Sequence, residues 1–110
     1  MSIPKPPADF SASSKTLWRQ VLEIYELSDA ELVILAELGR ALDRARQARA
    51  EIDRAGLTIE GRFGPRANPA CAIENQAVIR ASRLMRQLGL RDLDDQLAKQ
   101  RYGATRPEVV

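Results

Sequence analysis

Histidine is absent from this sequence of 110 residues, and cysteine occurs once, at Cys71. Without histidine, Ser-His-Asp and Cys-His nucleophile systems are excluded, and a closed Cys/His zinc site is out of reach. A single cysteine excludes an internal disulfide. The glycine patterns of phosphate-binding loops and dinucleotide-binding folds are absent as well. We therefore expect a non-catalytic protein with no cofactor and no metal site.

Aromatic residues and long apolar runs are also scarce. Aromatic residues make up 5% of the chain, although apolar residues reach 45%. Alanine supplies much of the apolar content, and each alanine buries little area. A small domain with such a thin core is often completed by oligomerisation. No run is long enough to span a bilayer and no signal peptide is evident, so we expect a cytoplasmic protein without membrane contact.

The charge is distributed unevenly along the chain. The net charge is +2 overall, but it is −4 over residues 17–39 and +6 over residues 40–91. Every basic residue of the second range is arginine, which binds phosphate in a bidentate manner better than lysine does. This asymmetry suggests one acidic and one basic partner surface. The alternative is a set of ordinary solvated helices with a compositional preference for arginine.

Local signals predict two long helices joined by an elbow. The capping box Ser28-Asp29-Ala30-Glu31 opens a helix over Asp29–Ala55, which Gly56 ends. Asn68-Pro69 opens another helix, to Leu88, which Gly89 ends. Residues 57–67 hold three glycine or proline breaks and form the elbow, with a small β-hairpin as one possibility. An earlier helix, capped by Ser13 or Ser14, extends to about Leu27, and a short one over residues 92–101 is plausible.

These elements predict an all-α fold: a long antiparallel helical hairpin with a preceding helix, assembling into an oligomer. We expect a flexible arm at residues 1–13, a single helical oligomerisation and DNA-binding domain at 14–101, and a flexible tail at 102–110. Alanines dominate the apolar stripes of both long helices, so another helix can approach closely. The residues expected at the oligomer interface are Trp18, Tyr25, Ala41, Ala45, Ala48, Ile52 and Leu84.

The arginines of the middle are the candidate nucleic-acid ligands: Arg40, Arg44, Arg62, Arg66, Arg80 and Arg83. Arg40 and Arg44 are a like-charged pair at helical spacing, without local carboxylates to neutralise both. Arg62 and Arg66 lie on the elbow around Phe63, which we expect to pack on its own helices. Asp43–Arg46 and Arg49–Asp53 are expected ion pairs, and Cys71 is expected to be a small buried apolar residue.

Taken in order, these features resemble the small terminase subunit of tailed bacteriophages. The likeness covers about residues 17–90. It rests on Leu17-Trp18, the break at Leu27-Ser28, the end at Ala55-Gly56 with Asn68-Pro69 after it, and the ending Arg83-Leu84-Met85-Arg86-Gln87-Leu88-Gly89-Leu90. That ending is similar to the family's "RLLRELGL". After it, this chain continues with the acidic segment Arg91-Asp92-Leu93-Asp94-Asp95, where the family has a Thr-Pro-type segment.

The resemblance implies a non-enzymatic component of the genome-packaging motor in the host-cell cytoplasm. It would form a ring of more than two copies, bind double-stranded viral DNA at the packaging start site, and deliver it to the large terminase subunit, which carries the ATPase and nuclease. The alternative from another class is a helical protein–protein scaffold or regulator that does not bind DNA.

Overall fold

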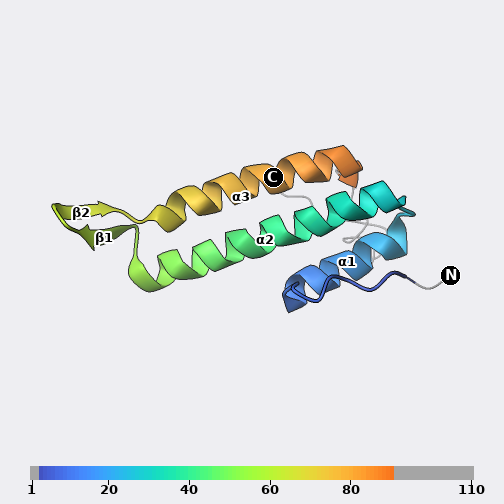
Figure 1. The fold of residues 1–110 in the computed structure, drawn as a ribbon, viewed down its shortest axis with the longest axis horizontal. Coiled ribbons are helices and arrows are strands. Elements are labelled where there is room, and N and C mark those ends of the chain that lie inside the picture. Colours follow the sequence, from blue (N-terminus) through green and yellow to red (C-terminus); the bar gives the residue numbers. More distant parts are fainter. Residues whose placement is uncertain (1–2, 91–110) are drawn as a thin grey trace, which may run out of the picture.

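The computed structural model describes residues 3–90. The elements are α1 (Ala12–Ile24), α2 (Asp29–Ala55), β1 (Thr58–Gly61), β2 (Gly64–Ala67) and α3 (Pro69–Leu88). Helices α2 and α3 lie side by side and antiparallel, and α1 packs along the N-terminal half of α2 (Figure 1). The two strands extend beyond the opposite end of this helical pair as an antiparallel hairpin. The fold is thus mostly helical, as predicted, with a two-stranded sheet in place of the elbow.

The predicted bounds of α2 are confirmed, because its ends are determined by local hydrogen bonds. The Ser28 hydroxyl accepts from the Glu31 backbone N–H at 3.2 Å, and the Glu31 carboxylate accepts from the Ser28 N–H at 3.0 Å. At the other end, Gly56 has a positive φ of 90°, a conformation that costs glycine little. The chain leaves the helix there and enters the hairpin.

The predicted bounds of α3 are also confirmed, because local contacts determine its ends as well. The Asn68 side-chain oxygen accepts from the Ala70 N–H at 3.0 Å. Its amide group donates to the Gly56 carbonyl at 2.9 Å, so one side chain caps α3 and also holds the end of α2 beside it. Gly89 ends α3 in the left-handed conformation, with φ of 70°.

The predicted bounds of α1 are wrong at both ends. The cap is Ser11, whose hydroxyl accepts from the Ser14 N–H at 3.2 Å. Ser14 is fully buried inside the helix and donates its hydroxyl to the Gly39 carbonyl at 3.1 Å. Ser14 already lies within the first turn of α1, after the cap, so it cannot be the capping residue. At the other end, Tyr25 is already extended, which stops α1 near Ile24.

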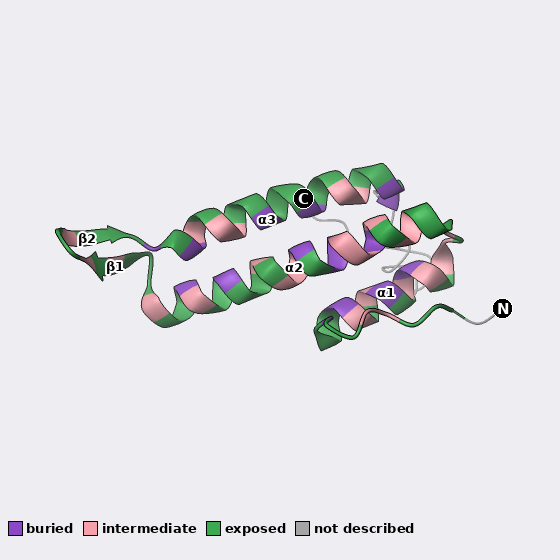
Figure 2. Ribbon diagram, in the orientation of Figure 1, coloured by how far each residue is buried: buried purple, intermediate pink, exposed green. Residues whose placement is uncertain are grey.

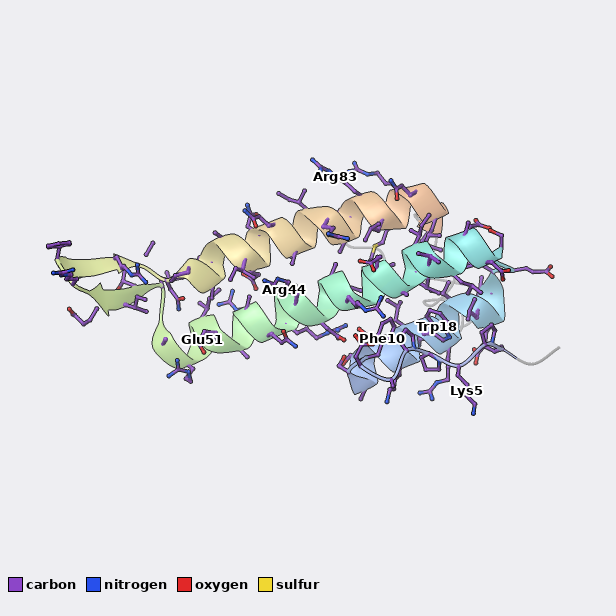
Figure 3. All side chains as sticks on the ribbon, in the orientation of Figure 1. Lys5, Phe10, Trp18, Arg44, Glu51 and Arg83 are labelled. Atoms are coloured by element: carbon purple, nitrogen blue, oxygen red, sulfur yellow. The ribbon has the colours of Figure 1, made fainter. Side chains whose placement is uncertain are left out.

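The residues before α1 pack against it. Phe10 is 5% exposed, and its ring meets Trp18 edge-on, with the ring centroids 5.9 Å apart. The Trp18 indole N–H donates to the Pro4 carbonyl at 2.8 Å, and Figure 3 shows the two rings beside each other. The described part of the predicted arm therefore contributes to the core. The domain boundaries stay predictions, and the proposed helix over 92–101 and the tail lie outside the described residues.

Buried side chains form two clusters along the helical pair (Figure 2). The larger lies where α1, α2 and the end of α3 meet, and consists of Phe10, Trp18, Val21, Leu35, Leu38, Ala41, Ala81, Leu88 and Leu90. The smaller lies near the hairpin and consists of Ala48, Ile52 and Ala70, with Cys71 and Ile73 packed against it. Cys71 is half-buried at this edge, and so is less enclosed than predicted.

The hairpin confirms the possibility of a short strand pair. Thr58 pairs with Ala67 and Gly61 with Gly64, so Arg62 and Phe63 form the tip. Phe63 is 96% exposed, so the expectation that it packs on its own helices is wrong. The reason is geometric: the strands carry the tip away from both helices (Figure 1).

Candidate functional site

Three of the candidate arginines and one carboxylate line the same cavity between α2 and α3. Glu37 accepts from Arg40 at 3.3 Å on its own helix and from Arg80 at 3.0 Å across the interface. Arg44 lies one turn beyond Arg40 on the same face of α2. These side chains line a cavity of about 310 Å³, with Ala41 and Ala77 as its other residues.

The small residues explain why the arginines can meet here. Ala41 and Ala77 are both buried, at 6% and 5% exposure. Side chains this short let two helices approach closely, so longer side chains on the flanks reach across. The sequence pattern showed that both stripes are rich in alanine. It did not show the register between α2 and α3, which decides that Arg80 meets Glu37.

Arg40 is more fully neutralised than the sequence suggested. Its guanidinium donates to Asp9 at 3.1 Å, in addition to its contact with Glu37. The hydrogen bond from Arg40 lowers the pKa of the Asp9 carboxyl. The expectation that Arg40 and Arg44 lack carboxylates is therefore wrong for Arg40. Asp9 was missed because nothing periodic links the segment before α1 to a position 31 residues later.

Arg44 and Arg83 are exposed and make no ion pair within residues 3–90. Figure 3 places Arg44 on α2 beside α3, and Arg83 on the outer side of α3. The other arginines of α2 are paired. Arg46 contacts Asp43 at 2.8 Å and Arg49 contacts Asp53 at 3.1 Å, as predicted, and Arg54 pairs with Glu51. Arg44 and Arg83 therefore contribute positive charge on α2 and α3 that no ion pair within residues 3–90 offsets.

The remaining two candidates lie far from this cluster. Arg62 and Arg66 belong to the hairpin, beyond the opposite end of α2. The Arg62 guanidinium carbon lies 5.6 Å from the centroid of the Phe63 ring, in a cation–π arrangement. The structure thus brings together Arg40, Arg44 and Arg80, leaves Arg83 on the outer side of α3, and separates the hairpin pair.

The predicted interface residues divide into two groups. Trp18, Ala41, Ala48 and Ile52 are buried within the single chain. Their packing inside the chain leaves little of their surface for a neighbouring subunit. Tyr25, Ala45 and Leu84 are half-buried and keep surface on the outside of the chain.

Two kinds of feature are not found in the part of the chain that the structure describes. Residues 3–90 contain no group of three or more His, Cys, Asp or Glu side chains arranged to hold a metal ion. Within the same residues, no helix is both long enough and apolar enough to cross a membrane.

Comparison with known proteins gives one match. The family model described as phage terminase, small subunit, matches residues 14–94, which is more than two thirds of the chain. No curated protein and no solved structure matches. The matched range contains α2, α3, the hairpin, the arginine cluster and all but the first two residues of α1. The chain therefore belongs to the phage terminase small subunit family, whose role is in phage DNA packaging.

Proposed function

We propose that this protein is the non-catalytic DNA-binding subunit of a phage packaging motor. More than two copies assemble into a ring, bind double-stranded viral DNA at the packaging start site, and deliver it to the large terminase subunit. That partner supplies the ATP hydrolysis and the DNA cleavage. Family membership supports the packaging role, and the arginines along α2 and α3 support DNA as the ligand.

The observation that carries the proposal is the arrangement around Glu37. Glu37 pairs with Arg40 and Arg80 on two helices, Arg44 lines the same cavity, and Arg83 is exposed on the outer side of α3. Holding long side chains in place lowers the entropy that binding would cost. Guanidinium groups pair with phosphate oxygens in a bidentate manner. In a ring, each subunit repeats the set, so modest contacts per subunit add up along the DNA backbone.

We assign the phosphate contacts first to Arg40, Arg44, Arg80 and Arg83, because they share one helical pair. Arg62 and Arg66 form a separate set on the hairpin and are tested separately. The described fold offers no obvious element for reading base edges, so binding should be mainly electrostatic. Affinity should then fall steeply with salt concentration and depend little on sequence.

A salt titration of duplex binding tests this assignment. Affinity for a short duplex is measured from about 50 to 200 mM salt for the wild type and for Arg44→Ala/Arg83→Ala. Each lost phosphate contact should reduce the salt slope by roughly one for every subunit that touches the DNA. The matched control is Arg19→Ala/Arg54→Ala, which removes the same charge from exposed positions outside the four arginines assigned to phosphate.

The proposal requires the first variant to show a smaller slope than the control while both keep the wild-type mass. Equal slopes in all three proteins would reject DNA contact through these residues.

A second candidate function is a helical scaffold without a DNA role. It is favoured by the ion pairs of Arg40 with Asp9 and of Arg80 with Glu37, which would serve folding alone in such a protein. An oligomer with no salt-dependent affinity for duplex would select this function.

A further inference from the structure

The hairpin tip presents an aromatic ring that no other part of residues 3–90 covers. Phe63 is 96% exposed, the highest value among the large apolar side chains of residues 3–90. Arg62 lies over the ring, and Arg66 is exposed on the adjoining strand. Any surface that receives this ring must also accommodate two positive charges. Aromatic and arginine side chains are the residues most often found at the energetic centres of protein interfaces.

A groove with the opposite character lies where α1 meets α2. Its volume is about 460 Å³. Its apolar lining comes from the segment before α1, the end of α1 and the start of α2, and consists of Ile3, Leu22, Ile24, Tyr25, Leu27 and Leu32. These side chains are half-buried except for Ile3, which is 42% exposed. The groove is therefore an apolar surface that residues 3–90 leave partly open.

Acidic side chains surround this apolar lining. Glu23, Glu26 and Asp29 also border the groove, are all exposed, and make no ion pair within residues 3–90. The sequence has no basic residue between Arg19 and Arg40, so this charge is not offset locally. An apolar surface with an acidic rim matches a ring flanked by two arginines in both polarity and charge.

The tip cannot reach the groove of its own chain. The groove includes Asp29, the first residue of α2, whereas the hairpin begins after Ala55, its last. A helix of 27 residues is about 40 Å long and keeps the two features apart (Figure 1). The complementary surface must therefore belong to another molecule, and a second copy of this chain always supplies one.

We propose that the hairpin tip of one subunit docks into the α1–α2 groove of the next. Phe63 enters the apolar floor, and Arg62 and Arg66 face Glu23, Glu26 and Asp29. Each subunit offers both surfaces, so in the proposed ring the contact is heterologous and repeats from subunit to subunit until the ring closes. This inference rests on the proposed ring and names the contact that builds it. Of the residues predicted at the oligomer interface, the half-buried Tyr25 lies at the groove and so belongs to this contact. Trp18 is buried in the core and does not.

The first test uses substitutions that leave the monomer's own packing intact. Phe63→Ser removes a side chain that is 96% exposed within residues 3–90, and Leu57→Ser is the matched control, since Leu57 is 69% exposed at the hairpin base. We expect Phe63→Ser to weaken self-association at least about tenfold, as loss of an interface anchor does, and Leu57→Ser to keep the wild-type mass. Light scattering over a concentration series measures both.

The second test mixes two defective variants. One carries Arg62→Glu/Arg66→Glu and lacks a working tip, and the other carries Glu23→Arg/Glu26→Arg and lacks a working groove. Each should have the mass of one chain when alone. In their mixture the wild-type tip meets the wild-type groove and the glutamate-bearing tip meets the arginine-bearing groove. Both junctions then pair opposite charges, so the two variants should co-assemble into a larger species that contains equal numbers of each. A protein carrying all four reversals should regain the wild-type assembly, because the charges are again opposite.

The outcomes separate this inference from the proposed function. An oligomeric wild type whose mass is unchanged by Phe63→Ser would overturn the docking contact and leave the ring standing. Unchanged mass with weaker duplex binding in Phe63→Ser would also overturn it, and would assign the tip to DNA. A wild type that is a monomer at high micromolar concentration would contradict the ring itself. A complex of only two wild-type chains would contradict the ring, while the mixing result would still test the contact.

Discussion

Gly39 shows at the scale of one residue how the segment before α1 is held. Glycine inside a helix is unfavourable by roughly 0.5–1 kcal/mol relative to alanine, so its place in α2 needs a reason. The ring of Phe10 supplies it: a Cβ on Gly39 would lie 2.2 Å from the Phe10 Cζ atom. The close approach of this ring to the helix backbone is possible only without a side chain.

Gly39→Val should therefore destabilise the protein by roughly 1–3 kcal/mol through overpacking. Thermal or urea unfolding measures the change. The combination with Phe10→Ala should cost less than the sum of the two single changes, because the ring that clashes is gone. A Gly39→Val protein as stable as the wild type would mean that Phe10 does not occupy this position in solution.

Asp43 joins the start of α1 to α2 through its carboxylate. It accepts hydrogen bonds from the Ser11 N–H at 2.9 Å and the Ser14 hydroxyl at 2.7 Å, and pairs with Arg46. Burial alone would raise its pKa, but the bonds from Ser11 and Ser14 and the charge of Arg46 outweigh it, so the pKa lies below its ordinary value. The side chain is only 12% exposed, which keeps these contacts away from water.

A lowered folded-state pKa gives a defined pH dependence. The stabilising contribution of Asp43 is fully present above the unfolded value of about 3.9 and is lost as the pH falls through the lower folded value. The free energy of unfolding should therefore decline below about pH 4, and Asp43→Asn should flatten that decline. Urea titrations at a series of pH values measure this, and identical profiles for both proteins would contradict it.

At the scale of elements, the bounds of two helices could be predicted from the sequence, and those of the third could not. Helices α2 and α3 were predicted residue by residue, because Ser28, Gly56, Asn68 and Gly89 mark their ends through local contacts. The start of α1 was misplaced, because several serines compete for the cap and tertiary contacts decide. The hydroxyl of Ser14 contacts the Gly39 carbonyl of α2 from inside α1, and the helix begins three residues earlier, with Ser11 as its cap.

That competition yields a matched pair of variants. Ser11→Ala should destabilise the protein by about 0.5–2 kcal/mol, since it removes both the cap of α1 and a hydrogen bond to Asp43. Ser13→Ala should change stability little, because Ser13 is exposed in the first turn. Equal effects of the two substitutions on the denaturation midpoint would contradict the assignment of the cap to Ser11.

The candidate site was predictable in part. Charge distribution alone pointed to Arg40, Arg44 and Arg80, and the structure brings these three together. The Glu37 contact to Arg40 lies at i, i+3 and could have been read from the sequence. The contact of Arg40 with Asp9 could not be predicted, because it depends on a segment without periodicity. The contact of Glu37 with Arg80 could not be predicted either, because it depends on the register of two helices. The exposure of Phe63 likewise depends on the direction in which the hairpin leaves the helices.

At the scale of the whole molecule, one end of the chain is acidic and partly open, and the other carries the hairpin with its arginines. Such polarity favours head-to-tail assembly over a symmetric pair. The arginines of α2 and α3 lie between these ends, so neighbouring subunits in a ring would present them as a repeated series. Assembly and DNA binding would then use different surfaces of the same helical framework.

The most direct test of this account is the native mass of the wild-type protein, measured alone and with one short DNA duplex. We predict a single species of more than two chains that takes up the duplex without dissociating. A complex of one or two chains on the duplex, or a multi-chain species that takes up no DNA at moderate salt, would contradict the account.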